Sequence, residues 1–244
     1  MNNLGIILTE DGSTTIFNSE KNEHFHSIHG AVQESMHVFI ENGYKYRHSL
    51  YADKLRLNQD KENTRGEKLN ILEIGFGTGL NALLTLNEIL INETDSPSVY
   101  YTGIEPNPLD QSIAELLNYC SFPEIRVPIA NFMQMHSAGI LKNLRLNNKF
   151  DFTKEITTFQ EFSNPSVQFD LVYFDAFSPV AEPDLWTDQI FEKIYSMMNV
   201  DGVLVTYCSK GSVRRSLQHQ GFKTERLPGP PGKHEMLRAT KLKL

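Results

Sequence analysis

The sequence has little that would mark a secreted, membrane-spanning or disulfide-bonded protein. Its 244 residues include only two cysteines, Cys120 and Cys208, which lie far apart and lack C-x-x-C spacing. No apolar run approaches the roughly 20 residues that span a bilayer. The N-terminal stretch MNNLGIILTEDG has no basic region and soon becomes polar. We therefore expect a cytoplasmic protein without a membrane segment, whose cysteines are reduced and buried.

Several motifs for specific chemistries are also absent. The chain has no G-x-x-x-x-G-K-[ST] loop that would grip nucleotide phosphates and no G-x-S-x-G nucleophile elbow. Its eight histidines show no H-x-x-x-H spacing, and we interpret His24, His26 and His29 as surface or lid residues of a loop near a helix start. We therefore expect no metal site.

The formal net charge of −7 means that a nucleic-acid partner would have to meet a local basic patch, because the overall field repels phosphates. Basic residues gather in the last third of the chain. Lys210 begins a predicted helix, Arg214 and Arg215 lie one turn on, and Lys233 lies in the loop GPPGKHE. These residues can grip phosphates around a pocket or can form a solvated face, and the composition favours neither reading.

From Leu69 onward, short apolar strands alternate with helices, a pattern typical of a parallel sheet covered on both faces. The last two strands are joined by the Pro/Gly-rich PGPPGK and suggest an antiparallel edge. Residues 120–168 are the least readable part. The predicted strands are 69–75, 98–105, 169–175, 202–208, 222–227 and 234–244, and the predicted helices are 80–92, 109–120, 182–199 and 211–221.

Residues 1–68 differ from this pattern and form a small N-terminal addition to the main unit, residues 69–244. Asp11-Gly12 lies between two strand-like stretches, GIILTE and STTIFN, and predicts a hairpin. The stretch SIHGAVQESMHVFIENGY places apolar residues on one helical face and predicts a helix that ends at Gly43. The polar stretch 58–68 predicts a loop.

The stretch EIGFGTGLN places three glycines between the first strand of the main unit and its helix, where the backbone can turn sharply and approach a ligand closely. A dinucleotide-binding loop requires G-x-G-x-x-G, but here the third position is Leu80 and the glycine is Gly79. The spacing G-x-G-x-G favours an adenosyl ligand without a pyrophosphate. Glu105 ends the second strand 30 residues after Gly75, where an acid can accept both ribose hydroxyls or can instead cap the next helix.

Asp175 ends a later apolar strand, FDLVYF, and begins the stretch DAFSPVAEPDLW. Because open α/β sheets bind ligands at the carboxyl ends of their strands, Asp175 faces the glycine loop if the two strands are neighbours. A carboxylate there can accept a hydrogen bond from an attacking amine and favour its neutral form. The alternative is a helix cap, a role that Asp184 could fill instead. Phe177 and Trp186 offer flat surfaces for stacking, although Trp186 is equally well explained as a core contact.

Together these stretches resemble the methyltransferase domain of the bacterial bifunctional enzyme MnmC, which completes 5-methylaminomethyl-2-thiouridine in tRNA, and especially its stand-alone methyltransferase forms. The resemblance implies a Rossmann-like S-adenosylmethionine-dependent methyltransferase fold of the α/β class. It implies a mostly parallel sheet with an antiparallel C-terminal edge strand, and an N-terminal hairpin and helix, 1–68, that cover the cofactor site. The matching stretches are EIGFGTGLNALL, DAFSPVAEPDLWTDQIF, GVLVTYCSKGSVRRSLQHQGF, GPPGKHEML and HGAVQESMHVFIENG.

The resemblance also implies an activity and roles for individual residues. The activity is N-methylation of 5-aminomethyl-2-thiouridine at the tRNA wobble position, with S-adenosyl-L-methionine as the cofactor and tRNA as the partner. Asp175 would lie beside the transferred methyl group and the substrate amine. The implied cofactor-binding residues are Glu73, Gly75, Gly77, Thr78, Gly79, Glu105 and Asp175, and the implied substrate or tRNA contacts are Phe177, Lys210, Arg214, Arg215 and Lys233.

The sequence departs from the bifunctional pattern at three points. The chain stops at Leu244, where the bifunctional enzymes continue into a flavin-dependent oxidase domain, so we expect the methyl step alone. Ala176 replaces a glycine, and FDFTKEITTFQEF offers no Gly-Asp pair for the adenine. Two other functions share parts of the pattern. One is an aminopropyltransferase of the spermidine-synthase type, against which the basic final third argues; the other is a catalytically silent RNA-binding module, against which the intact glycine loop, Glu105 and Asp175 argue.

Overall fold

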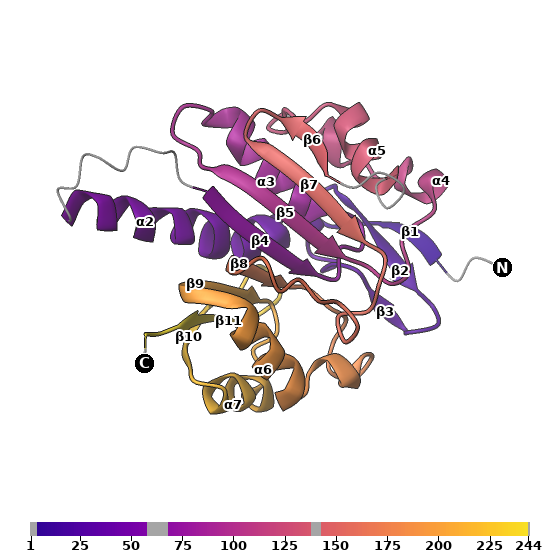
Figure 1. Ribbon diagram of the computed structural model, residues 1–244. Helices are drawn as coiled ribbons and strands as arrows, with labels where there is room; N and C mark the ends of the chain where they lie inside the picture. Colours follow the sequence, from indigo (N-terminus) through magenta and orange to yellow (C-terminus); the bar gives the residue numbers. More distant parts are fainter. Residues whose placement is uncertain (1–3, 58–67, 138–142, 244) are drawn as a thin grey trace.

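Eight strands form the central sheet of the computed structural model, which describes residues 4–57, 68–137 and 143–243, the side chains of 52–57 excepted. The strand order is β10-β11-β9-β8-β4-β5-β7-β6 (Figure 1). The predicted loop at 58–68 lies almost entirely outside the described residues. The strands are β4 Lys68–Ile74, β5 Ser98–Ile104, β6 Leu144–Asn147, β7 Phe150–Glu155, β8 Phe169–Phe174, β9 Met198–Thr206, β10 Phe222–Pro228 and β11 Glu235–Lys241.

The five strands β9, β8, β4, β5 and β7 run parallel, which confirms the predicted α/β sheet. β11 is antiparallel to both β9 and β10, so the antiparallel C-terminal strand lies one place in from the edge that the sequence suggested. Burial explains this order: Met236, Leu237 and Ala239 of β11 are fully buried, whereas β10 has several exposed positions and can occupy the edge. β6 pairs antiparallel with β7 at the opposite edge.

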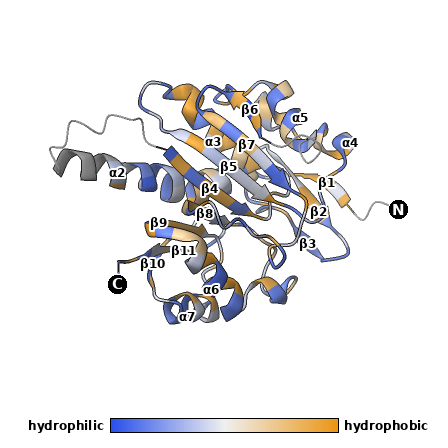
Figure 2. Ribbon diagram, viewed as in Figure 1, coloured by the Kyte–Doolittle hydropathy of each residue, from blue (hydrophilic) through white to orange (hydrophobic). Residues whose placement is uncertain are grey.

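Helices cover the two faces of the sheet, and side chains that alternate along each strand pack against one layer or the other. On β8, Tyr173 packs with the layer of α3 Leu80–Ile91, while Phe174 packs with α6 Asp188–Met197 and α7 Gly211–His219. Figure 2 shows hydrophobic residues along α3, which is buried between the sheet and the N-terminal helices. Both cysteines are free, Cys208 buried and Cys120 half-buried.

The N-terminal residues form a separate small sheet, β1 Leu4–Leu8, β2 Thr14–Asn18 and β3 Glu23–His24. The predicted hairpin is confirmed, because β1 and β2 pair antiparallel. Gly12 adopts a positive φ of 84° in the turn, and the Asp11 carboxylate accepts a hydrogen bond from the Ser13 backbone N–H at 2.9 Å. These contacts are the turn chemistry that an Asp-Gly pair supplies.

The predicted end of the N-terminal helix at Gly43 is wrong. The helix runs on from α1 Ala31–Ser35 through a π-helical segment, η1 Met36–Lys45, into α2 Tyr46–Leu57. Gly43 instead lies where the helix packs so closely on the sheet that a side chain would not fit. A Cβ at this position would lie 3.0 Å from a Val205 methyl carbon and 3.1 Å from the Tyr173 ring.

Two predicted helices are shorter than expected. The segment 109–120 contains only α4 Gln111–Ala114 and a 3-10 turn, η2 Tyr119–Ser121. The segment 182–199 begins with the 3-10 turn η3 Pro183–Leu185, and Thr187 rather than Asp184 caps α6. The poorly readable stretch 120–168 holds α5 Ile129–Ser137 as well as β6 and β7. In the part of the chain that the structure describes, no helix is both long and apolar enough to cross a membrane.

Candidate active site

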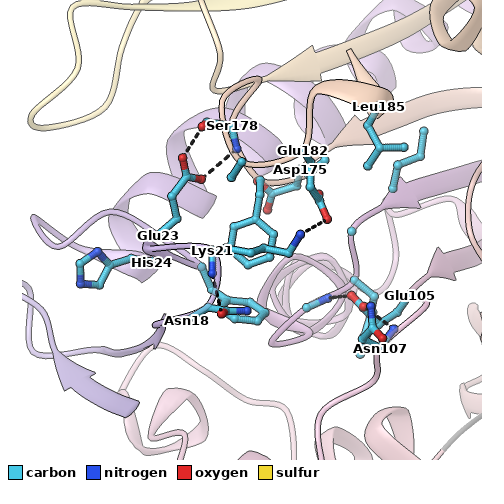
Figure 3. Close-up of a pocket in the computed structure, with 18 of the residues that line it drawn as sticks. Asn18, Lys21, Glu23, His24, Glu105, Asn107, Asp175, Ser178, Glu182 and Leu185 are labelled. Atoms are coloured by element: carbon cyan, nitrogen blue, oxygen red, sulfur yellow. Dashed lines mark hydrogen bonds and ion pairs between the residues drawn. The ribbon is translucent and has the colours of Figure 1, made fainter. Parts of the chain in front are cut away.

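A cavity of about 950 Å³ lies where β4, β5, β7 and β8 end, at the edge at which open α/β sheets bind ligands. This volume is at the upper end of the range typical of small-molecule sites. Part of the wall consists of the loops after these strands, including Gly75, Glu105 and Asp175. The N-terminal segment supplies another part, including Phe25 and Glu34. Figure 3 shows how side chains from both sources point into one space.

The glycine loop fits a closely held ligand because its backbone leaves no room for side chains. Gly75, Gly77 and Gly79 have positive φ values of 89°, 51° and 74°. A Cβ on Gly75 would lie 2.5 Å from the Asp175 carbonyl oxygen, and one on Gly77 would lie 3.0 Å from the Phe25 ring. The loop therefore passes tightly between the end of β8 and the N-terminal segment, and its backbone forms one wall of a cradle.

Glu105 is bound by backbone N–H groups on both of its oxygens. Oε2 accepts from Gly77 at 2.9 Å, and Oε1 accepts from Asn107 at 2.9 Å. Burial raises the pKa of the carboxyl group, and these two hydrogen bonds oppose the rise. A carboxylate offers about four acceptor positions. Glu105 is thus oriented toward the cavity with capacity left for two hydroxyl donors, which is the chemistry of a ribose.

Asp175 is oriented by an asparagine that sequence reasoning missed. Asn81 Nδ2 donates to Asp175 Oδ2 at 2.8 Å and to Glu73 Oε1 at 2.9 Å. Glu73 is fully buried and does not line the cavity, so its connection to the site runs through Asn81. Burial raises the pKa of Glu73 well above its usual value, which favours the neutral acid. The signal in the sequence is a polar residue two positions after Gly79, in the first turn of a largely apolar helix.

The environment of Asp175 makes it a proton acceptor near neutral pH. Its pKa is raised to about 7, mainly by burial and also by the negative charge of Glu34, while the Asn81 hydrogen bond and Lys233 act in the opposite direction. β8 pairs with β4, and the Asp175 N–H donates to Ile74 O at 3.0 Å. As the sequence predicted for neighbouring strands, Asp175 lies beside the glycine loop, and its carboxylate lines the same cavity as Glu105.

The two aromatic residues of the DAFSPVAEPDLW stretch, Phe177 and Trp186, have different roles: Phe177 lines the cavity, and Trp186 packs behind it. Phe177 lines the cavity and meets Phe25 edge to face at 4.9 Å between ring centres. Trp186 packs edge to face on Phe174 at 4.7 Å, and its Nε1–H donates to Phe177 O at 2.8 Å. Trp186 is thus a core contact that holds the loop, one of the two readings that the sequence left open.

The segment carrying Phe177 is tied to the N-terminal strands. The Lys21 ammonium pairs with Glu182 at 2.8 Å, and Glu23 accepts hydrogen bonds from the backbone N–H and the hydroxyl of Ser178. These interactions are the dashed lines near the top and centre of Figure 3. They fix two loops that are distant in sequence across one side of the cavity.

Two histidines hold the glycine loop at Thr78, a predicted cofactor-binding residue that lines the cavity. His26 Nε2 lies 2.7 Å from Thr78 Oγ1, and His136 Nε2 lies 3.1 Å from Thr78 O. Burial lowers the pKa of each imidazole to about 4, so both are neutral at physiological pH. Of His24, His26 and His29, which the sequence suggested as surface or lid residues, His24 and His26 line the cavity, and His26 is a buried partner of the glycine loop rather than a surface residue.

The four predicted basic contacts are not brought together. Lys233 lines the cavity and forms an ion pair with Glu34. Lys210 is exposed before α7, and Arg214 and Arg215 lie on that helix outside the cavity lining. Among the residues that the structure describes, no group of three or more His, Cys, Asp or Glu side chains is placed to hold a metal ion.

Comparisons with known proteins agree with this fold. Residues 125–242 match a family described as S-adenosyl-L-methionine-dependent methyltransferase. The tRNA 5-methylaminomethyl-2-thiouridine biosynthesis bifunctional protein MnmC of Burkholderia thailandensis is 25% identical over 239 residues, covering 95% of this chain and 34% of that protein. The MnmC protein of Pseudomonas fluorescens is 29% identical over 220 residues, covering 88% of this chain and 31% of that protein. This chain therefore spans about a third of the length of these curated relatives.

A solved structure shows the same fold. The crystal structure of MnmC2 from Aquifex aeolicus superimposes with a TM-score of 0.74 at 22% identity, covering all of this chain and 73% of that one. The resemblance to the MnmC methyltransferase domain and the predicted Rossmann-like fold are confirmed. The methyltransferase class and the S-adenosyl-L-methionine cofactor are confirmed by the family match, and the comparisons favour neither the aminopropyltransferase nor the silent RNA-binding module.

Proposed function

We propose that this chain is the S-adenosyl-L-methionine-dependent N-methyltransferase that converts 5-aminomethyl-2-thiouridine to 5-methylaminomethyl-2-thiouridine at the tRNA wobble position. The observation that carries the proposal is the placement of Asp175. Its carboxylate is oriented by Asn81, faces the same cavity as the glycine loop and Glu105, and has a pKa of about 7. A base of that strength can take a proton from the ammonium form of a primary amine and aim the lone pair that results.

Individual residues have separate roles in this proposal. The backbone of Gly75–Gly79 and the Glu105 carboxylate hold the adenosyl part of the cofactor, which supplies an electrophilic methyl group on its sulfonium. Thr158 and Gln160, which follow β7 and line the cavity, are the candidates for the adenine that the sequence left unassigned. Phe177 forms an apolar wall for the target base, and Asp175 receives the proton of the amine.

The surrounding segments would complete a site for tRNA. The N-terminal unit that the sequence predicts at 1–68 would cover the cofactor, and the contacts of Phe25 and His26 with the glycine loop support this role. Most of a tRNA is too large to enter the cavity and would lie outside it. Its backbone phosphates would contact Lys210, Arg214 and Arg215 on the α7 side. A tRNA substrate would place the protein in the cytoplasm, and the aminomethyl group would have to be supplied by another enzyme activity.

Nucleoside mass spectrometry of tRNA tests the proposal. Deleting the gene should make 5-aminomethyl-2-thiouridine accumulate, and the purified protein with S-adenosyl-L-methionine should convert it to the methylated nucleoside. Asp175→Asn should abolish conversion while retaining tRNA binding. The matched control is Asp184→Asn, which removes an exposed carboxylate from the same cavity lining and should leave conversion intact. Unchanged wobble nucleosides in the deletion strain would refute the substrate, and full activity of Asp175→Asn would refute the role of that carboxylate.

A further inference from the structure

An ion pair lies in the same cavity as Asp175. The Lys233 ammonium contacts Glu34 Oε1, and the Ser27 backbone N–H donates to Glu34 Oε2 at 2.7 Å. Glu34 is only 5% exposed, yet both Glu34 and Lys233 line the cavity. Taking a charge out of water is unfavourable unless it is paired and hydrogen-bonded, so the buried Glu34 carboxylate and its half-buried partner Lys233 are a built feature of the site.

The fold brings the two partners together from opposite ends of the chain. Glu34 lies on α1, and Lys233 lies in the loop between β10 and β11, 199 residues later. This loop is joined to the N-terminal helix, because His37 Nε2 lies 2.7 Å from Pro228 O. Gly232 has a φ of 81° and packs against His29, where a Cβ would lie 2.1 Å from the imidazole. A glycine is therefore required directly before Lys233.

Lys233 is also fixed by an aromatic ring. Its Nζ lies 4.0 Å from the centre of the Tyr207 ring, a cation–π contact. The Tyr207 hydroxyl donates to Ala176 O at 2.9 Å, directly after Asp175. The ammonium is thus held from two sides, by Glu34 and by Tyr207, and this arrangement is connected to the loop that carries the predicted base.

The charges around Asp175 do not cancel. Two carboxylates, Asp175 and Glu34, share the space with one ammonium, Lys233. The same cavity also holds the carboxylates of Glu23 and Glu105, which accept hydrogen bonds from backbone N–H groups of Ser178 and Gly77. Four buried groups near Asp175 are neutral at physiological pH, because burial lowers the pKa of one histidine and raises the pKa of one carboxyl and two phenols. These neutral groups are His26 on the N-terminal segment, Glu73 on β4, Tyr101 on β5 and Tyr207 after β9. When Asp175 is ionised, the group formed by Asp175, Glu34 and Lys233 carries one net negative charge.

We propose that the Glu34–Lys233 ion pair sets the charge around Asp175, so that this end of the cavity takes up a primary amine as its ammonium ion and Asp175 then removes the proton. The proposal rests on the amine chemistry of the proposed function. The ammonium gives one proton to the Asp175 carboxylate and becomes a neutral amine with a free lone pair. When that nitrogen forms its bond to the methyl carbon, the carbon–sulfur bond breaks and its electron pair remains on sulfur, and the proton leaves Asp175 for solvent. Glu34 and Lys233 act through Asp175 and are positioning residues.

The two partners should shift the titration of Asp175 in opposite directions. A nearby negative charge favours the protonated carboxyl and a nearby positive charge favours the carboxylate. Glu34→Gln removes the negative charge and should lower the titration midpoint of Asp175, by on the order of one pH unit. Lys233→Met removes the positive charge while keeping an unbranched side chain, and should raise the midpoint by a similar amount. If the pair had only a structural role, the two variants would not shift the titration midpoint of Asp175 in opposite directions.

The test is a titration of the purified, ligand-free protein by carbon NMR with carboxyl-labelled aspartate, in which Asp175→Asn identifies the Asp175 signal. Lys233→Arg keeps the charge and should restore a midpoint near that of the wild type, which separates charge from packing. Lys21→Met is the matched control, because Lys21 lines the same cavity but pairs with Glu182 instead; it should leave the midpoint unchanged. Shifts of the same sign in Glu34→Gln and Lys233→Met, or no shift in either, would overturn the proposal.

The uptake of a cation is tested with propylamine as a simple primary-amine probe. Propylamine should lower the Asp175 midpoint in the wild type and should do so several-fold less effectively in Glu34→Gln, while propanol should have no effect. An amine effect equal in both proteins would overturn the role of the ion pair. These readouts need no tRNA and no turnover, so a failure of the tRNA experiment refutes the proposed substrate separately from the charge arrangement.

Discussion

Replacing Asp175 with asparagine should make the protein more stable at pH 8 than the wild type, while the predicted methyl transfer is lost. The reason is that the folded protein holds this carboxyl group in a partly buried position where burial raises its pKa from 3.8 to about 7. Asparagine has nearly the same shape. Its amide oxygen can still accept the hydrogen bond from Asn81 Nδ2, which lies 2.8 Å from Asp175 Oδ2. The substitution therefore removes the charge with little change in packing.

The sign and size of the effect follow from linkage. Between the unfolded pKa near 3.8 and the folded pKa near 7, the unfolded chain has lost the Asp175 proton and the folded chain still holds it. Stability therefore falls as pH rises through this window. One pKa unit corresponds to about 1.4 kcal/mol, so the rise from pH 5 to pH 7 costs the wild type up to about 2.7 kcal/mol. Because Asp175 is open to water in the cavity, screening reduces this value, and we expect about 1–2 kcal/mol.

Urea unfolding at pH 5 and pH 8 measures the effect. The difference in unfolding free energy between Asp175→Asn and the wild type should be about 1–2 kcal/mol more favourable to the variant at pH 8 than at pH 5. Asp184→Asn is the control, since its exposed side chain should change stability little at either pH. Two results would refute the raised pKa. The difference in unfolding free energy between variant and wild type could be equal at both pH values, or it could favour the variant more at pH 5 than at pH 8.

Three further substitutions test the cofactor cradle and the N-terminal helix. Glu105→Gln leaves one of two backbone N–H groups facing an amide NH₂ and should weaken S-adenosyl-L-methionine binding about tenfold or more in calorimetry; unchanged affinity would contradict the ribose role. Gly77→Ala imposes a side chain at a φ of 51° and should also weaken binding, with a cost of about 1–2 kcal/mol. Gly43→Ala should destabilise this protein by about 1–3 kcal/mol in urea unfolding, although the same change would stabilise an exposed helix. The added methyl group would meet Val205 and Tyr173, which are fully buried and cannot move away. A more stable variant would show that the helix can shift.

The strands and the glycine loop could be predicted because their signals are local. An apolar run such as FDLVYF is buried on both faces wherever it lies in a parallel sheet, and all six of its residues are buried. The G-x-G-x-G spacing and the acid 30 residues later belong to one strand–helix–strand unit, which places Glu105 beside Gly77. Asp175 could be added because parallel strands end at the same edge of a sheet.

The rest of the site depends on contacts between distant parts of the chain, for which the sequence has no local pattern. For Lys233 the sequence left a phosphate contact and a solvated face open, and the resemblance implied a substrate or tRNA contact. The sequence does not show that Glu34, 199 residues away, lies against it. Gly43 was interpreted as a helix end, because a glycine that ends a helix and one that lets a helix approach a sheet look alike in sequence. His26 and His136 gave no signal, since each acts on the glycine loop from a separate element.

The N-terminal segment contributes to the cavity in a way that depends on a shared core. Ile16 of β2 and Phe39 of η1 belong to the same hydrophobic cluster as the sheet residues Ile71 and Tyr173, so the described part of the segment shares one core with the sheet. Glu34 lies on α1, whose residues Ala31 and Val32 belong to this core. Close packing of the core therefore fixes the position of the Glu34 carboxylate. A charge that must act on Asp175 benefits from such placement, because the strength of an electrostatic effect depends steeply on distance and on the exclusion of water.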